Sequence, residues 1–285
     1  MFGLRPDGKK IKNVDPIMKI LPHIMKERAD GQNMSKYEVD CEKLDAFIAK
    51  ELEKGISYNY MHIVIASILR VVALRPRLNR FVMNGRLFKR KYISVSFVVK
   101  KSLRDDVPET TIKLKFTGKE TIKDVKDMMD EVIKKNTSVK SVNGTDKLAK
   151  VLTIVPNFLI KFLVWFIKWL DKHGMLPGKI IDLSPFHTTF FVTNLKSIKT
   201  DYIYHHIYNF GNTGTFFSMG KEHMEAVVNN DGEIVAKKIM KLGIVMDERF
   251  CDGFYFANSL RYLKRIIDNL DVLNQPLENI VEDVK

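Results

Sequence analysis

The sequence predicts an α/β protein in which one large domain spans residues 1–285. Amphipathic helical patterns and strand-like runs alternate along the chain, and a long strand near the C-terminus leads directly into a last helix. With 285 residues, of which 45% are apolar and 28% charged, the chain can bury a substantial core.

The first half predicts an arm followed by helices and strands. Residues 1–20 carry Pro6, Gly8 and Pro16 and indicate an irregular N-terminal arm. The segment 42–54 has apolar residues at helical spacing, and 59–75 is apolar almost all round, as in a buried central helix. Thr121 is a suitable N-cap for a further helix at 121–135. Strands are expected at 35–40, 92–99 and 110–116, with a hairpin turn at Asn84-Gly85.

The chain after residue 186 is predicted to be mostly β-structure. The patterns place strands at 190–195, 203–208, 214–220, 223–228 and 233–247. A hairpin turn is expected at residues 230–232 (Asn-Asp-Gly), and 254–270 is an amphipathic helix.

The segment 151–170 is the most hydrophobic of the chain and belongs to a helical insertion at about 148–185. It is not a clean membrane span, because Pro156, Lys161 and Lys168 interrupt it. We expect its helix to pack on protein with a narrow lysine stripe outward. The alternative is a helix lying in a membrane interface, which its lysines and two tryptophans favour.

The formal charge of +13 favours anionic partners such as nucleotide-bearing cofactors, nucleic acid or an anionic membrane. The lysines are scattered, as on an ordinary solvated surface, and we expect no nucleic-acid partner. Cys41 and Cys251 are far apart, which indicates reduced thiols and no zinc site, and no metal is expected. The N-terminus is polar and basic without an apolar stretch, so we expect a cytoplasmic protein, with the membrane periphery as the alternative.

Three motifs carry a family resemblance. Residues 247–253 (DERFCDG) resemble the Asp-His-Arg-x-x-Asp-Gly signature of the 2-oxo acid dehydrogenase acyltransferases and the His-His-x-x-x-Asp-Gly signature of chloramphenicol acetyltransferases. Residues 189–195 (TFFVTNL) resemble the Thr-Phe-Thr-Ile-Ser-Asn-Leu strand of that family, and 216–220 (FFSMG) its next strand. Residues 75–79 (RPRLN) resemble its Pro-x-Leu-Asn segment.

The resemblance implies a chloramphenicol acetyltransferase-like fold, a two-layer sandwich with a mixed sheet and helices on one side. It implies acyl transfer from coenzyme A or another pantetheine thioester to an unknown acceptor. It also implies a homotrimer, or a higher assembly, with active sites between subunits. By position, Thr193 would be the oxyanion donor and Asp252 a structural carboxylate that pairs with an arginine. Asn194 would support the site, and Gly253 would allow a tight turn into the last helix.

The departure from the family is Glu248, which stands where the resemblance implies a catalytic histidine. A glutamate has an ordinary pKa of about 4.3 against about 6.5 for histidine, so it is the weaker base unless burial raises it. Three hypotheses follow. Glu248 is a base tuned by burial, or another histidine has taken over, or the chain is an inactive trimeric scaffold. The candidate histidines are His187, His205 and His206.

Overall fold

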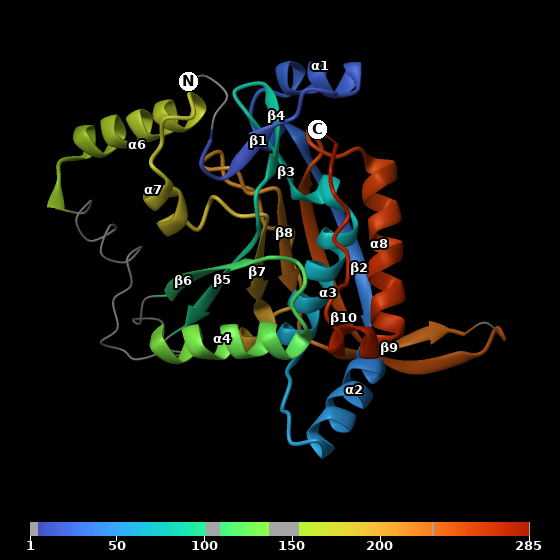
Figure 1. Cartoon of the computed structure of the whole chain (residues 1–285). Coiled ribbons are helices and arrows are strands. Elements are labelled where there is room, and N and C mark those ends of the chain that lie inside the picture. Colours follow the sequence, from blue (N-terminus) through green and yellow to red (C-terminus); the bar gives the residue numbers. More distant parts are fainter. Residues whose placement is uncertain (1–4, 101–108, 137–153, 230, 285) are drawn as a thin grey trace.

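The computed structural model describes residues 5–100, 109–136, 154–229 and 231–284 (Figure 1). Its main sheet has the strand order β2-β10-β8-β7-β5-β6, with β9 paired to β10. Strand β7 is parallel to both β5 and β8, while the other neighbours are antiparallel, so the sheet is mixed. The strands are β2 Gln32–Asp40, β5 Ile93–Lys100, β6 Glu109–Phe116, β7 Phe190–Asn194, β8 Thr215–Met219, β9 His223–Val228 and β10 Ile234–Asp247.

Four helices pack on one face of this sheet, which confirms the predicted mixed sheet with helices on one side. They are α2 Cys41–Glu53, α3 Tyr60–Leu74, α4 Ile122–Asn136 and α8 Gly253–Asp268. Helix α3 is buried on nearly every side because it contacts α4, α8 and β5 together, as its apolar sequence predicts. The start of α4 and the end of α2 also lie where the sequence predicts them. The Thr121 hydroxyl accepts a hydrogen bond from the Asp124 amide (3.2 Å), and Gly55 ends the α2 segment with φ of +82°.

A second, three-stranded sheet has the order β1-β4-β3, formed by Gly8–Lys10, Arg86–Arg90 and Arg80–Met83. The turn between β3 and β4 has positive φ at both Asn84 and Gly85, as predicted for the hairpin. The expectation of an irregular arm at 1–20 is wrong for its described part, because the arm includes β1 and the start of α1 (Pro16–Ile24). The side chain of Arg5 holds the arm in place through buried ion pairs with Asp7 (3.0 Å) and Asp171 (2.7 Å).

The opposite face of the main sheet is covered by the segment 201–208. The strand predicted at 203–208 is wrong, since these residues form no strand and instead cross over β8 and β10. The Ile203 amide donates to Ser218 Oγ (3.1 Å) rather than to a strand backbone. At Gly243 a Cβ atom would lie 2.1 Å from the Ile203 carbonyl, so only glycine lets the segment approach this closely. Ile207 completes a small apolar cluster here with Phe191, Phe216 and Val245.

The predicted insertion is helical where it is described, with α6 at Asn157–Lys172 and α7 at Gly178–Leu183. The expectation that α6 packs on protein is wrong: Asp171 is its one buried residue, and its aromatic side chains are exposed. Residues 137–153, which include the first three residues of the predicted segment 151–170, lie outside the described chain. Every helix in the described ranges falls short of the length and apolar character that a membrane span requires.

Candidate functional site

The turn after β10 is held by a buried ion pair between the first and third residues of its motif. Arg249 donates from Nε and from one terminal nitrogen to the two carboxylate oxygens of Asp247, both at 2.7 Å. The same guanidinium donates to the carbonyls of Met25 (3.2 Å) and Lys26 (3.1 Å). Arg28, also buried, lies 3.8 Å from the Asp247 carboxylate. The position of Glu248 is therefore fixed by its neighbours on both sides.

Glu248 itself is half-buried, and its amide donates to the Gly31 carbonyl of the chain before β2 (2.8 Å). No described residue forms a hydrogen bond or an ion pair with its carboxylate. The backbone of the candidate base is thus fixed while its side chain faces no partner within this part of the chain.

Thr193 lies far from Glu248 in the same chain. In the sheet, Thr193 on β7 is level with Ser218 on β8 and Gly243 on β10. Glu248 is five residues further along the β10 direction and two strands away, which amounts to about 19 Å from strand rise and spacing. One copy of the chain therefore cannot bring both groups to the same carbonyl. Asn194, beside Thr193 at the end of β7, is also half-buried.

Asp252 is the N-cap of α8. Its carboxylate accepts from the Tyr255 amide (2.8 Å), and Arg77 donates to its other oxygen (3.4 Å). Arg77 therefore lies where an arginine can pair with Asp252, although both side chains of the pair are about half exposed. It lies within the Arg-Pro-Arg-Leu-Asn motif, but only the fold brings it to α8. Arg75 and Arg77 also lie over the Tyr255 ring, at 3.8 and 4.9 Å from its centre.

Gly253 does not serve the tight turn that we expected. Its φ lies outside the positive region, and an added Cβ atom would meet nothing within 4 Å. The next residue, Phe254, is 77% exposed. The start of α8 is therefore an open surface in the single chain.

His187 is a structural residue in this chain. It is buried, with Nε2 3.1 Å from an Asp171 oxygen and Nδ1 2.7 Å from Ser184 Oγ. Burial lowers the pKa of His187, while the nearby Asp171 carboxylate opposes that effect. With both ring nitrogens engaged, it is a poor candidate for a replacement base.

Adjacent residues of the predicted strand 203–208 would point to opposite faces, but His205 and His206 do not. Their rings stack on each other, with centres 4.7 Å apart, and His205 also stacks on Phe216 (4.0 Å). The chain that follows them is tied to the residues before β2, where Arg28 donates to the carbonyls of Tyr208 and Gly211. Since Gly31 also binds the Glu248 amide, this histidine-bearing segment ends beside the Glu248 turn.

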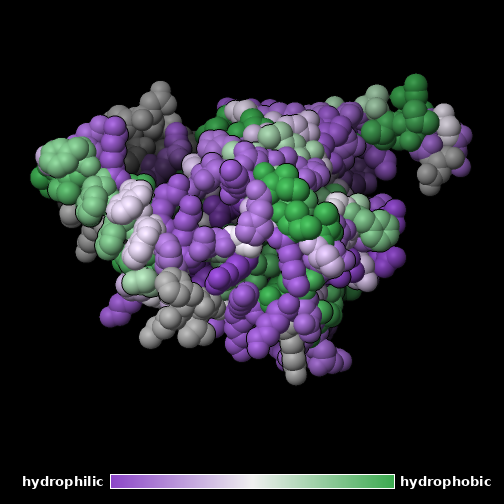
Figure 2. All heavy atoms as spheres, turned by 90° about the horizontal axis from the view of Figure 1, so that it is seen from above, coloured by the Kyte–Doolittle hydropathy of each residue, from purple (hydrophilic) through white to green (hydrophobic). Residues whose placement is uncertain are grey.

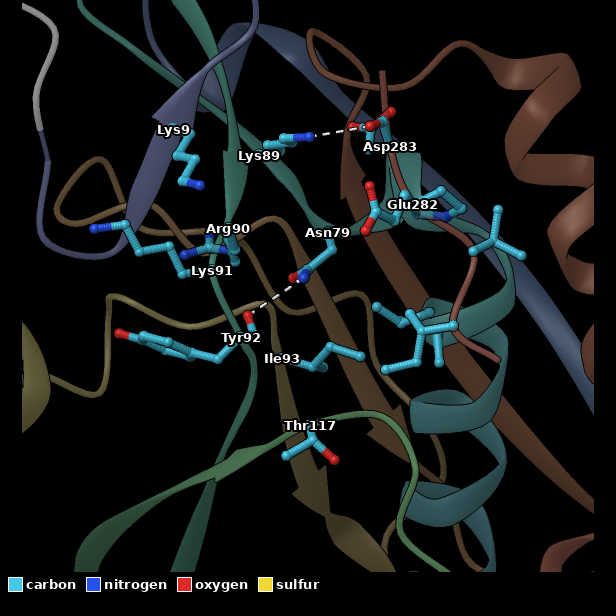
Figure 3. Close-up of a pocket in the computed structure, with 15 residues that line it drawn as sticks. Lys9, Asn79, Lys89, Arg90, Lys91, Tyr92, Ile93, Thr117, Glu282 and Asp283 are labelled. Atoms are coloured by element: carbon cyan, nitrogen blue, oxygen red, sulfur yellow. Dashed lines mark hydrogen bonds between the residues drawn. The ribbon is translucent and has the colours of Figure 1, made fainter. Parts of the chain in front are cut away.

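A hollow of about 470 Å³ lies between the small sheet and the C-terminal tail (Figure 3). Lys9, Lys89 and Arg90 lie on its sheet side, and Glu282 and Asp283 on its tail side. Asn79 links it to the motifs, because its amide donates to the Tyr92 carbonyl (3.2 Å) and its oxygen accepts from the Thr189 hydroxyl (2.7 Å). Asn79 of the Pro-x-Leu-Asn-like segment therefore positions the start of β7.

Both cysteines are buried within the core. Burial raises the pKa of Cys41 to about 11 and that of Cys251 to about 12, so neither is a thiolate nucleophile at neutral pH. No three His, Cys, Asp or Glu side chains of the described residues are placed to hold a metal ion.

Comparison with known proteins confirms the resemblance. Residues 186–274 match the family model of the 2-oxoacid dehydrogenases acyltransferase (catalytic domain). That range includes the β7 strand, the β8 strand and the turn after β10. None of the curated proteins matches the sequence significantly.

Three solved structures share the fold over most of the chain. A probable dihydrolipoamide acetyltransferase from Listeria monocytogenes is 15% identical, with a TM-score of 0.58, and the match covers 92% of this chain and 95% of that one. The dihydrolipoamide acetyltransferase of Azotobacter vinelandii is 12% identical, with a TM-score of 0.59 and coverage of 93% and 94%. The cubic core of a pyruvate dehydrogenase multienzyme complex is 12% identical, with a TM-score of 0.58 and coverage of 93% and 94%. The chain therefore has the fold of the 2-oxoacid dehydrogenase acyltransferase catalytic domain, and its residues 186–274 carry the sequence pattern of that family.

Proposed function

We propose that this protein transfers an acyl group from coenzyme A or another pantetheine thioester to a small-molecule acceptor, at sites formed between the subunits of a homotrimer. The observation that carries the proposal is the separation of Thr193 and Glu248, each in its motif position but about 19 Å apart in one chain. A shared site brings Glu248 of one copy to Thr193 of the next.

In this reaction Glu248 removes the proton from the acceptor thiol or hydroxyl, whose sulfur or oxygen then attacks the thioester carbonyl. The Thr193 hydroxyl donates a hydrogen bond to the resulting oxyanion. Collapse of the tetrahedral intermediate breaks the bond from carbonyl carbon to sulfur, and the proton held by Glu248 returns to the departing coenzyme A thiol. The balance is acceptor plus acyl-coenzyme A giving acylated acceptor plus free coenzyme A.

A subunit interface also supplies what Glu248 lacks in the single chain. A glutamate is the more useful as a base the more completely water is excluded from its carboxylate, and Glu248 is only half-buried in the single chain. The open surface at Gly253 and Phe254 lies at the end of the motif, where a second copy would add burial.

The relatives support narrower proposals. Two of them are dihydrolipoamide acetyltransferases by description, so a dithiol is a reasonable first acceptor to test. One forms the cubic core of a multienzyme complex, which supports testing for an assembly larger than a trimer.

A non-catalytic trimeric scaffold is the second candidate. It is favoured by one observation: no described side chain orients the Glu248 carboxylate, whereas catalytic bases are usually held by a neighbouring group.

One assay on three proteins separates these functions. Wild type, Glu248→Gln and Glu248→His are incubated with acetyl-coenzyme A and dihydrolipoamide, and free coenzyme A is measured by chromatography. If Glu248 is a working base, wild type turns over and Glu248→Gln loses about 10²–10⁴-fold, the usual contribution of general-base catalysis. If the base has been lost, only Glu248→His gains activity.

The two remaining outcomes of this assay also distinguish between the proposed functions. Equal activity in wild type and Glu248→Gln would transfer the base role to another group, with His205 and His206 the candidates left. No turnover in any of the three, together with no coenzyme A binding by calorimetry, would contradict acyl transfer and leave the scaffold.

We also propose a peripheral membrane contact through residues 151–170, on the separate observation that the aromatic side chains of α6 are exposed.

A further inference from the structure

Helix α6 presents a continuous aromatic surface to solvent. Phe158 is 74% exposed, Trp165 58% and Phe162 53%, and Phe166 and Trp169 are exposed as well. The rings follow one another along the helix, with Phe162 stacked on Phe166 (6.1 Å) and Phe166 on Trp169 (6.3 Å). In Figure 1 the helix projects from the body of the molecule. A contiguous apolar surface of this kind marks an interaction site.

The flank of this aromatic surface is basic. Lys161 and Lys168 are seven residues apart, and Lys168 and Lys172 are four residues apart, so the three form one stripe along the helix. Lysines with long apolar stems beside exposed tryptophan and phenylalanine are typical of helices that lie at a membrane surface.

A second helix adds apolar side chains at the same end of the molecule. Ile17, Ile20 and Ile24 of α1 are exposed, Ile24 at 68%. Seen from above in Figure 2, hydrophobic surface appears over α6 at the left and over α1 near the middle, with hydrophilic surface between them.

The surface between the two helices contains a basic pocket of about 260 Å³. Helix α1 contributes His23 to it, and α6 contributes Lys168 and Lys172. Further cations come from Lys26, Arg28 and Arg249. Arg249 and Arg28 face Asp247 (2.7 and 3.8 Å), and Asp171 is paired with Arg5 (2.7 Å). The charged lining that remains is Lys26, Lys168 and Lys172 against Glu27, so the pocket carries an excess of positive charge.

We propose that α1, α6 and the pocket between them form a docking surface for a membrane rich in anionic phospholipid. The exposed side chains of α6 and α1 enter the boundary between headgroups and acyl chains, while Lys26, Lys168 and Lys172 receive the phosphate groups. This inference rests on the proposed membrane contact and is independent of acyl transfer. To the contact already proposed for residues 151–170, this inference adds helix α1, the basic pocket and the requirement that the lipid be anionic.

Charge favours lipid over a second copy of this chain. Each copy has a formal charge of +13, and a symmetric contact through this surface would bring the same lysines together. An anionic membrane neutralises these lysines instead. Each lysine near the membrane surface is expected to strengthen binding about fivefold.

The chain contains its own probe for this contact, because its two tryptophans, Trp165 and Trp169, both lie in α6. The full-length protein is titrated with phosphatidylcholine vesicles with and without phosphatidylglycerol. The expected result is a blue shift of tryptophan emission and quenching by brominated acyl chains, both strongest with phosphatidylglycerol and weakened by salt. Co-flotation with the same vesicles measures the bound fraction.

Paired variants test the two parts of the surface. Phe158→Ser with Trp165→Ser, which leaves Trp169 as the probe, should weaken binding at least tenfold, as expected when two large apolar side chains no longer enter the membrane. The matched control is Val228→Ser with Ile234→Ser, which removes similarly exposed apolar side chains from the β9–β10 hairpin and should leave binding unchanged. Lys168→Gln with Lys172→Gln should weaken binding to anionic vesicles about fivefold per lysine. Lys119→Gln with Lys221→Gln, two exposed lysines elsewhere, is its control.

Circular dichroism of every variant excludes unfolding as the cause. Equal binding to neutral and anionic vesicles would overturn the anionic-lipid inference and leave the membrane contact standing. Absence of binding to either vesicle would overturn both. If, in that case, the aromatic variant also reduces the mass of the protein in solution, the surface is a contact between copies of the chain.

Discussion

Lys113 on β6 is a half-buried cation whose hydrogen-bond partners are backbone oxygens. Its ammonium donates to the carbonyls of Ile181 (2.7 Å) and Ser184 (3.2 Å), at the end of α7. Loss of water and, to a smaller extent, the nearby Arg90 lower the pKa of Lys113 to about 7, while Asp182 opposes the shift. The ordinary value is 10.5, so the unfolded chain keeps the proton over a pH range in which the folded chain has lost it.

A pH dependence follows for the Lys113→Met variant, which keeps the apolar stem and removes the titration. Below about pH 7 the ammonium is charged in both states, so the difference in unfolding free energy between wild type and variant is constant. From about pH 7 to 10.5 the unfolded wild type binds more protons than the folded one, so wild type gains stability relative to the variant. Urea unfolding of both proteins across this range measures the difference. A difference that stays flat up to about pH 10 would show that water reaches the ammonium.

At the scale of elements, Asp252 ties the motif turn to the start of α8. Asp252→Ala removes the acceptor for the Tyr255 amide and should cost about 1 kcal/mol of unfolding free energy, as for other helix N-caps. Asp252→Asn keeps an acceptor and loses only the charge opposite Arg77, a partly exposed pair that contributes a few tenths of a kcal/mol. Thermal unfolding of the two variants separates the roles. If Asn is as damaging as Ala, the ion pair with Arg77 matters more than the cap.

The elements predicted correctly are those determined by residues close together in the sequence. Helices α2, α3 and α8 follow from apolar spacing, and the β3–β4 turn follows from Asn84 and Gly85. The segment 203–208 has the tyrosines and isoleucines of a strand, but its partner is the Ser218 side chain, which no local pattern indicates. The apolar run in α6 indicated burial, yet composition does not say whether protein or lipid covers it.

The candidate site was predictable only in its parts. The motifs identified Thr193, Glu248 and Asp252 from short runs of sequence. The five-residue offset between Thr193 and Glu248 depends on the register of β7, β8 and β10, which are far apart along the chain. The pairing of Arg77 with Asp252 joins residues 175 positions apart, so the resemblance implied an arginine without locating it.

For the whole molecule, the separation of Thr193 and Glu248 makes activity a property of the assembly. Each copy would carry one half of two different sites, as expected of a closed ring with head-to-tail contacts. Mass measurement at micromolar concentration should give a trimer or a multiple of it, and a stable monomer would contradict the shared site.

Mixing of two inactive variants tests the shared site directly. Thr193→Val removes the oxyanion donor while keeping its shape, and Glu248→Gln removes the base, so each variant alone should be inactive if Glu248 is the working base. After unfolding and refolding together in equal amounts, a site is complete when its threonine comes from the Gln variant and its glutamate from the Val variant. Random assembly of a three-fold ring makes about one quarter of sites complete, so about a quarter of wild-type turnover should return. The control is the same mixture made after separate refolding, which should stay inactive unless subunits exchange. A site contained within one chain would recover nothing in either mixture, because every chain would carry one of the two lesions.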